Sequence, residues 1–305
     1  MPHVAANGIE LYYEEQGDPA APPLLLIMGL GTQMIAWPDA FVAGLVAAGF
    51  RVIRFDNRDI GLSTDLKDAP APGIVWTAAA VRFGLPVRVA YSLTDMAADT
   101  VGLMDALGID RAHVVGASMG GMIAQLVAAN HPDRVLSLTS IMSSSGARGL
   151  PGPTPALRRR LLTRRPRNAT RDQLIAATEQ TLEMISFPDP ARPADAFRIA
   201  AAAAIDRSYN PLGLRRQLLA IIADGSRVKR LASVRAPTLI VHGRADPLVP
   251  LAAGEDLVRH IPGARLEIID YMAHDLPPSQ TDRLVTLIAA HAGGVERVKG
   301  IEPSS

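Results

Sequence analysis

The sequence predicts an α/β protein with a mostly parallel central sheet that has helices on both faces. Short, solidly apolar runs closed by glycine recur along the chain, and such runs are typical of strands buried on both faces. Stretches with apolar residues at helical spacing lie between them, and this alternation of strand and helix favours parallel strands. The alternation stops over residues 143–230 and then resumes, which indicates a helical insertion.

The N-terminal half contains the first six expected strands. Asn7-Gly8 lies between short alternating stretches and supplies the positive φ angles of a tight hairpin turn, which joins the first two strands. Apolar residues at helical spacing and a glycine C-cap at Gly108 mark one of the helices that follow. After the hairpin, the expected strands are 23–28, 51–56, 112–116 and 135–142, and the expected helices are 37–48, 93–107 and 119–129.

The C-terminal half separates an insertion from the rest of the core. Residues 143–230 contain Pro-rich turns, several helical patterns and no convincing strand. The strands expected at 237–242 and 265–269, with helices expected at 252–260 and 280–290, complete the sheet and its cover. We therefore expect a core of 1–142 and 231–293, a helical insertion of 143–230 after the sixth strand, and a flexible tail of 294–305.

The composition excludes several function classes. The 305 residues include 31 Lys and Arg against 30 Asp and Glu, and this balance gives no reason to expect nucleic acid or an anionic membrane as partner. The absence of cysteine excludes disulfides, cysteine-ligated zinc, iron–sulfur clusters and a thiol nucleophile. No apolar run approaches the roughly 20 residues that span a bilayer, and the first residues show no signal-peptide pattern. We therefore expect a soluble, cytoplasmic protein.

The strongest chemical signal is the segment Gly116-Ala117-Ser118-Met119-Gly120-Gly121, between an expected strand and an expected helix. A G-x-S-x-G pattern in this place is typical of a nucleophile elbow, a tight turn that holds the serine hydroxyl above the sheet. Side chains at Gly116 and Gly120 would collide with neighbouring backbone, and the helix N-terminus favours negative charge beside Ser118. The alternative is a glycine-rich turn whose serine only caps the helix. The position between strand and helix favours the nucleophile.

A serine hydroxyl needs a base to remove its proton, and His274 is the histidine that fits this role. It follows the last expected strand in a loop, where its side chain can reach the carboxyl edge of the sheet. The alternative for His274 is a solvated loop residue. His242 ends a strand and is interpreted as backing the loop that follows. The other histidines belong to the N-terminal arm, to a strand or to helices, and are His3, His113, His131, His260 and His291.

The base needs a carboxylate that holds one tautomer and stabilises the positive charge, and we expect Asp246 in this role. Asp246 lies just past the strand before the one that leads to His274, so both side chains converge on the same edge of the sheet. The chain order Ser118, Asp246, His274 matches the order of nucleophile, acid and base in such proteins. Asp270 and Asp275 are rivals, but an aspartate next to a histidine rarely reaches Nδ1 of that histidine. The alternative for Asp246 is a simple turn residue.

Two backbone N–H groups are expected to form an oxyanion hole beside the serine. One belongs to Met119, the residue after the nucleophile. The other comes from the loop Met28-Gly29-Leu30-Gly31, in which Leu30 is the expected donor by its position. We also expect Gly29 of this loop to lie against the substrate.

Together these segments resemble the α/β-hydrolase superfamily, in particular its single-domain bacterial esterases and lipases, over essentially the whole chain outside the insertion. The resemblance implies the α/β-hydrolase fold, with 143–230 as a cap over the pocket, and neither a metal nor an organic cofactor. Many relatives have histidine at the position of Met28, and methionine there is similar to the subgroup that contains the aclacinomycin methylesterase. The segments that carry the resemblance are Leu26-Ile27-Met28-Gly29-Leu30-Gly31, Phe55-Asp56-Asn57-Arg58-Asp59-Ile60-Gly61-Leu62-Ser63, Gly116-Ala117-Ser118-Met119-Gly120-Gly121, Pro237-Thr238-Leu239-Ile240-Val241-His242-Gly243 with Asp246, and Ala273-His274-Asp275.

The cap is expected to supply apolar walls for an acyl or alkyl group, although most of its apolar residues simply pack the cap onto the core. We expect Met184 and Phe187 at the substrate. Trp37, soon after the oxyanion loop, either lines the pocket or anchors the first helix. The full set of apolar cap residues that fit a pocket wall is Leu182, Met184, Ile185, Phe187, Phe197, Ile199 and Leu218.

Two charged segments have alternative interpretations. Asp56-Asn57-Arg58-Asp59 follows a strand, and Arg58 either contacts substrate or, as we expect, forms an ion pair that organises its loop. A run of arginines in the cap either attracts an anionic substrate or surface or, as we expect, forms a solvated helix face. This run consists of Arg158, Arg159, Arg160, Arg164, Arg165 and Arg167.

The sequence therefore predicts a serine carboxylic ester hydrolase that acts on a small-molecule ester through an acyl-enzyme intermediate. The same three residues also fit other bonds: a carbon–carbon bond of a diketone, an amide or lactone, or perhydrolysis with peroxide. Dehalogenases and epoxide hydrolases use aspartate at the elbow, whereas this chain has Ser118. A non-catalytic, ligand-binding member of the fold is the alternative from another class. Oligomeric state and preferred acyl length are left open by the sequence.

Overall fold

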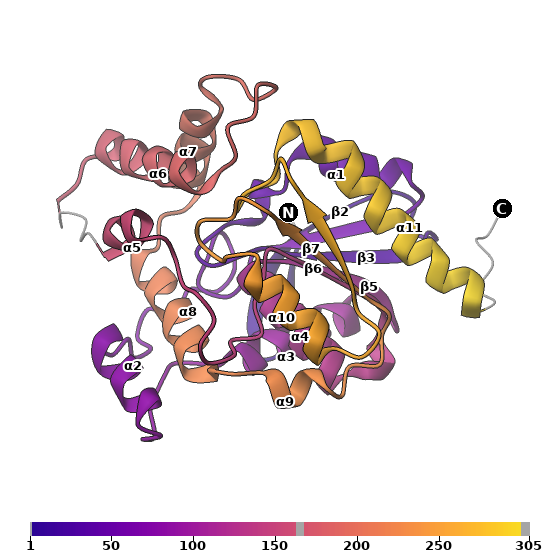
Figure 1. The fold of residues 1–305 in the computed structure, drawn as a ribbon, viewed down its shortest axis with the longest axis horizontal. Coiled ribbons are helices and arrows are strands. Elements are labelled where there is room, and N and C mark those ends of the chain that lie inside the picture. The colour runs from indigo at the N-terminus through magenta and orange to yellow at the C-terminus, as the bar shows by residue number, and fades with distance from the viewer. Residues whose placement is uncertain (1, 163–167, 300–305) are drawn as a thin grey trace.

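The computed structural model describes residues 2–162 and 168–299. Its centre is an eight-stranded sheet with the order β1-β2-β4-β3-β5-β6-β7-β8 (Figure 1). β1 and β2 are antiparallel, as are β2 and β4, and the other neighbours are parallel. The predicted mostly parallel sheet is thereby confirmed. The strands are β1 His3–Ala6, β2 Ile9–Gln16, β3 Pro23–Ile27, β4 Arg51–Phe55, β5 Ala112–Ala117, β6 Val135–Ile141, β7 Thr238–Gly243 and β8 Arg265–Ile269.

Alternate residues of the central strands face two separate layers of hydrophobic core. Leu24 and Leu26 of β3 pack in one layer, and Leu25 and Ile27 pack in the other. The first layer is covered by α1 Asp39–Ala47 and α11 Thr281–Lys299, and the second by α3 Leu93–Ala106, α4 Met119–Asn130 and α10 Ala252–His260 (Figure 1). Because both faces are buried, the strands are solidly apolar rather than alternating.

The described residues between β6 and β7 form five helices. They are α5 Pro155–Leu162, α6 Arg171–Ile185, α7 Ala196–Arg207, α8 Pro211–Asp224 and α9 Val228–Leu231. The described part of this segment contains no strand, as the sequence predicts. In Figure 1, α5, α6, α7 and α8 lie together on one side of the sheet, as a cap would. The boundaries of core and cap near residues 142 and 231 stay a prediction.

Two helices differ from the sequence-based expectation. α2 Ile74–Arg82 lies where the sequence indicated no element, and it packs beside α8. Trp76 on α2 is 69% exposed, whereas the other tryptophan of the chain, Trp37, is fully buried. α11 continues to Lys299, so the segment after Gly293 begins as helix rather than tail. Residues 300–305 lie outside the described part, and the flexibility of a C-terminal tail stays a prediction.

Among the helices that the structure describes, none combines the length and the apolar character needed to cross a bilayer.

Candidate active site

The nucleophile candidate is held by the turn between β5 and α4. Ser118 is the single residue between the two elements and has φ 56° and ψ −118°. A residue with a side chain rarely adopts this conformation, so the turn is strained. The turn is also tight: a Cβ atom on Gly116 would lie 2.2 Å from the carbonyl oxygen of Gly120, and one on Gly120 would lie 2.0 Å from that of Ile27. The elbow geometry expected from the glycines is confirmed.

Three side chains from three separate loops form a hydrogen-bonded chain at the carboxyl edge of the sheet. Ser118 Oγ lies 3.0 Å from His274 Nε2, and His274 Nδ1 lies 2.7 Å from Asp246 Oδ2. Because a carboxylate only accepts, Nδ1–H donates to Asp246, and Nε2 is left to accept the serine hydroxyl. The Asp246 side chain is fully buried and that of His274 is 7% exposed. The structure thus brings together the three residues selected from the sequence.

The carboxylate of Asp246 is fixed from both sides. Its Oδ1 accepts the N–H groups of Leu248 at 2.9 Å and Val249 at 2.8 Å, which leaves Oδ2 for the histidine. His242 Nε2 donates to the carbonyl oxygen of Val249 at 2.8 Å and so supports the same loop from behind, as interpreted from the sequence. Burial lowers the pKa of His242 below its ordinary value, even though the bond to Val249 raises it. A lowered pKa favours the neutral ring at neutral pH, and a neutral His242 forms no ion pair with Asp246 across their 3.7 Å separation.

The loop after β3 passes directly beside the serine. A Cβ atom on Gly29 would lie 3.1 Å from Ser118 Cβ and 3.6 Å from its Oγ, so glycine leaves this space open. The N–H of Gly31 donates to Gln217 Oε1 of α8 at 2.8 Å, and Leu30 therefore remains the donor candidate of this loop. Met119 begins α4, where N–H groups have no intrahelical acceptor. The oxyanion roles of Leu30 and Met119 stay a prediction.

The two rival aspartates have other partners. Asp270 pairs with Arg244 at 2.5 Å on the surface, where both side chains are more than half exposed. Asp275 Oδ1 accepts the N–H of Phe187 at 3.1 Å, and its Oδ2 pairs with Arg192. Burial raises the pKa of Asp275 above its ordinary value, although these contacts act in the opposite direction. Sequence reasoning missed the contact of Asp275 with the segment that follows α6.

The expected substrate-contacting residues have different surroundings. Trp37 is fully buried and stacks on Phe41 of α1 with ring centroids 5.4 Å apart, which favours the helix-anchoring alternative. Met184 near the end of α6 and Phe187 just after it are half-buried. Ile199 on α7 is 59% exposed to solvent, unlike a pocket wall. Substrate contact by Met184, Phe187 and Gly29 stays a prediction.

Buried ion pairs organise the loop after β4. Arg58 binds Asp99 through two hydrogen bonds of 2.6 and 2.5 Å, so the ion-pair interpretation of Arg58 is confirmed. Asp59 binds Arg216 of α8 through two bonds of 2.7 Å. Burial alone would raise the pKa of Asp59, but the hydrogen bonds from Arg216 and Tyr91 bring it below its ordinary value. Asp59 is therefore a buried carboxylate that joins the loop after β4 to α8.

The arginine run of the cap is described only in part. Arg158 and Arg159 are exposed on α5, which agrees with a solvated helix face. Arg160 is partly buried and donates to the carbonyl oxygen of Ala177 on α6. The other predicted members, Arg164, Arg165 and Arg167, lie outside the described residues.

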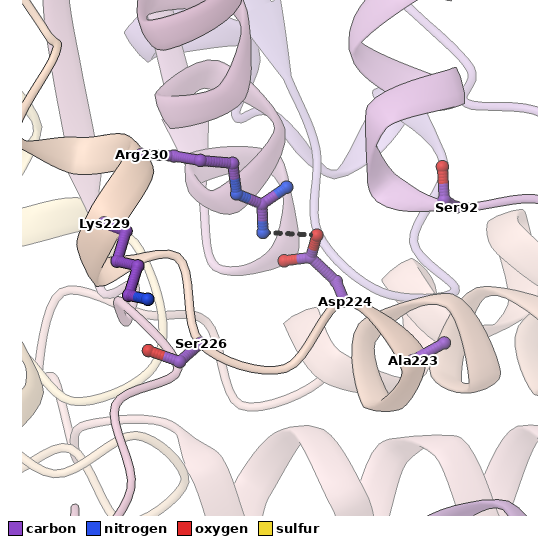
Figure 2. A pocket seen from close by; sticks show the side chains of 6 residues that line it. All are labelled: Ser92, Ala223, Asp224, Ser226, Lys229 and Arg230. Carbon is purple, nitrogen blue, oxygen red and sulfur yellow. Dashed lines mark hydrogen bonds and ion pairs between the residues drawn. The ribbon is translucent and has the colours of Figure 1, made fainter. Parts of the chain in front are cut away.

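The cavity drawn in Figure 2 does not involve the predicted site residues. It has a volume of about 540 Å³ and is lined by Ser92, Ala223, Asp224, Ser226, Lys229 and Arg230. Asp224 and Arg230 form an ion pair of 2.7 Å across its wall. In the described ranges, no group of three or more His, Cys, Asp or Glu side chains could hold a metal ion.

The fold and this site define the class of the protein. A strained serine follows the fifth strand, and a histidine bonded to a buried aspartate follows the eighth. A model of the alpha/beta hydrolase fold family matches residues 22–277. The chain belongs to this family.

Similar proteins cover almost the whole chain. The rhodomycin D methylesterase DnrP of Streptomyces peucetius is 30% identical over 308 residues, which is 94% of this chain and 96% of that protein. A 2-hydroxy-6-oxononadienedioate/2-hydroxy-6-oxononatrienedioate hydrolase of Burkholderia vietnamiensis is 29% identical and covers 89% of this chain and 88% of its own. The crystal structure of the enol-lactonase from Burkholderia xenovorans LB400 has a TM-score of 0.73 at 23% identity, and covers 96% of this chain and 100% of its own. This last likeness supports the fold alone.

Proposed function

We propose that this α/β hydrolase is a serine carboxylic ester hydrolase, with Ser118 as nucleophile, His274 as base and Asp246 as the acid that orients it. The observation that carries the proposal is the hydrogen-bonded chain from Ser118 Oγ through His274 to Asp246, with distances of 3.0 and 2.7 Å. Nucleophile and base are within the distance that proton transfer requires, and the base is oriented by a third group.

In the first half of the reaction, Ser118 Oγ attacks the ester carbonyl carbon while its proton passes to His274 Nε2. The carbonyl oxygen becomes an oxyanion, which the N–H groups of Leu30 and Met119 stabilise. The tetrahedral intermediate then breaks its bond to the alcohol oxygen, and that oxygen takes the proton from His274. The alcohol leaves and the acyl group stays on Ser118.

In the second half, a water molecule attacks the acyl carbon and gives its proton to His274 Nε2. The bond to Ser118 Oγ breaks, Oγ recovers the proton from His274, and the carboxylic acid leaves. The Asp246 carboxylate keeps Nδ1 protonated and stabilises the imidazolium in both halves. No further group has to enter the reaction, because every proton that leaves Ser118 or water passes through His274.

The likeness to a rhodomycin D methylesterase supports an ester as substrate. Methyl esters, in which the leaving alcohol is methanol, are therefore the first substrates to try. The likeness to a hydrolase of 2-hydroxy-6-oxononadienedioate favours a second candidate, in which the same side chains cleave a carbon–carbon bond. Both candidates use Ser118 and His274, so they differ only in the bond presented to the serine.

The test is hydrolysis of p-nitrophenyl esters of graded acyl length and of a set of methyl carboxylates. We expect activity in the parent protein and a fall of at least about 10³-fold in kcat for Ser118→Ala, because the nucleophile is lost. A parent protein that is inert on every ester but is labelled at Ser118 by a fluorophosphonate contradicts ester hydrolysis and favours the carbon–carbon candidate. A parent that is neither active nor labelled contradicts the nucleophile itself and favours a ligand-binding protein.

A further inference from the structure

The loop that carries His274 is joined to the cap by a short segment after α6. Residues 185–192, called the strap below, begin at the last residue of α6. The backbone N–H of His274 donates to the carbonyl oxygen of Ile185 at 2.9 Å. Farther along the same loop, the N–H of Ser279 donates to Asp189 Oδ2 at 2.8 Å. The strap therefore contacts the histidine loop at two separate places.

An ion pair lies at the centre of this contact. Arg192 of the strap pairs with Asp275, and both side chains are 11% exposed. Asp275 Oδ1 accepts the N–H of Phe187 in the strap at 3.1 Å and the N–H of Ala273 in its own loop at 3.2 Å. Arg192 also donates to the carbonyl oxygen of Phe187 at 2.7 Å. One carboxylate and one guanidinium thus bind the main chains of both segments.

The position of His274 matters because its two ring nitrogens must reach two separate partners. Nε2 has to stay near 3.0 Å from Ser118 Oγ while Nδ1 stays near 2.7 Å from Asp246. Displacement of a reacting group by about 1 Å can lower a rate by roughly 10²-fold. Loops are also less exact than helices or strands in holding such groups, so a base on a loop needs support from its neighbours.

We propose that Arg192 and Asp275 are positioning residues for His274, so that the docked strap of the cap holds the base in register with Ser118. This inference rests on the proposed function of Ser118 and His274. The described hydrogen-bond partners of the two side chains are each other and the main chain at Phe187 and Ala273, not the side chains of Ser118, His274 or Asp246. Arg192 and Asp275 act through the main chain of the loop. The cap then helps to hold the base in position, in addition to covering the pocket.

The test compares variants of this pair with variants of a second arginine–aspartate pair in the cap. Asp275→Asn removes the negative charge of the ion pair with almost no change in size. Arg192→Gln removes the positive charge and shortens the side chain, and Arg192→Lys keeps the positive charge. The matched control is Arg171→Gln, because Arg171 binds Asp206 through two bonds of 2.6 Å while both side chains are more than half exposed. All variants are made in the full chain.

The readouts separate a positioning role from a folding defect. The first is kcat and KM on the best p-nitrophenyl ester, and the second is fluorophosphonate labelling, followed both as a rate and as a final labelled fraction. We expect Asp275→Asn and Arg192→Gln to lower kcat and the labelling rate by about 10-fold or more, with KM within about twofold and full final labelling. Arg192→Lys should recover part of the rate, and the double variant should lose little more than either single one.

Several outcomes would overturn the proposal. If Asp275→Asn and Arg192→Gln have the same kcat and labelling rate as Arg171→Gln, the Arg192–Asp275 ion pair does not position the base. A lower final labelled fraction with an unchanged rate constant would show a structural role alone. If Asp275→Asn does not fold, the comparison of Arg192→Lys with Arg192→Gln decides the question. A parent protein that neither hydrolyses esters nor is labelled contradicts the proposed function instead, which the parent measurement reveals before any variant is compared.

Discussion

At the scale of single residues, Ser118 combines two demands that oppose each other. Its φ of 56° and ψ of −118° project the hydroxyl from the turn between β5 and α4. The same angles are unfavourable for any residue with a side chain, at about 1 to 3 kcal/mol. The neighbouring glycines make the turn tight enough to impose these angles. The site is therefore a place where local stability is given up for the position of one oxygen atom.

This strain leads to a prediction about stability rather than activity. Ser118→Gly should be more stable than Ser118→Ala by about 1 to 2 kcal/mol, because glycine adopts positive φ freely, while its greater flexibility in the unfolded chain offsets part of the gain. Denaturant unfolding of the two inactive variants measures the difference. An alanine variant as stable as the glycine variant would show that the turn is not strained.

At the scale of elements, α8 connects the segment between β6 and β7 with two loops of the core. Its Arg216 binds Asp59 with both side chains buried, and its Gln217 donates to the carbonyl oxygen of Arg58 at 2.9 Å while accepting the N–H of Gly31. One turn of helix thus contacts the loop after β4 and the loop after β3 together. The loop beside Ser118 depends on this helix for one of its hydrogen bonds.

We expect Arg216→Met to lower the free energy of unfolding by about 3 to 5 kcal/mol, because it leaves the buried Asp59 carboxylate without its cation. The double variant Arg216→Met with Asp59→Asn should lose less than the sum of the single losses, since no charge then remains unpaired. Denaturant unfolding provides the measurement. Arg171→Met is the control and should change stability little, because its ion pair is exposed. Equal effects at Arg216 and Arg171 would contradict the importance of burial.

Sequence patterns predict elements well where the signal is local. The run before Gly29, the glycines around Ser118 and the apolar stretch before His242 each combine burial, turn and position within a few residues. These signals locate the strands of the core and the loops at their carboxyl ends. Because such loops meet at one edge, Asp246 and His274 could be assigned without any contact information.

The remaining parts could not be predicted because they depend on contacts between distant segments. Asp275 meets Phe187 across 88 positions of sequence, and nothing near either residue indicates this partner. The sequence around Trp37 fits both a pocket-lining residue and an anchor of the first helix, and its stacking on Phe41 favours the anchor. α2 lies in an apolar stretch flanked by Pro and Gly, where turn signals obscure the helical spacing.

At the scale of the whole molecule, two buried histidines make stability depend on pH. Burial lowers the pKa of His242, and it does the same for His291 of α11, although hydrogen bonds to backbone carbonyls act against it in both cases. The folded protein therefore keeps both rings neutral at pH values where the unfolded chain, with an ordinary pKa of 6.5, takes up protons. Their contribution to stability is full well above pH 6.5, where the unfolded histidines are also neutral, and is lost as the pH falls through 6.5 toward the lower folded pKa values.

We expect the free energy of unfolding to be nearly constant from pH 8.5 to about pH 7.5 and to fall as the pH decreases through about 6.5. The slope should reach up to about 1.4 kcal/mol per pH unit for each histidine. Denaturant titrations at several pH values give this slope. His291→Gln should reduce the slope by up to the contribution of one histidine. An unchanged slope in that variant would contradict the assignment. Asp99 and Asp275, whose pKa values burial raises, act with the opposite sign at lower pH.

The placement of the two tryptophans gives the molecule an optical signature. Trp37 is sealed in the core against α1, and Trp76 is 69% exposed on α2. The intrinsic fluorescence is then a sum of a blue component that water-soluble quenchers cannot reach and a red component that they can. A ligand that covers α2 shifts only the second component, whereas loss of the core shifts the first. Emission spectra recorded with and without iodide therefore distinguish an event at α2 from unfolding of the sheet.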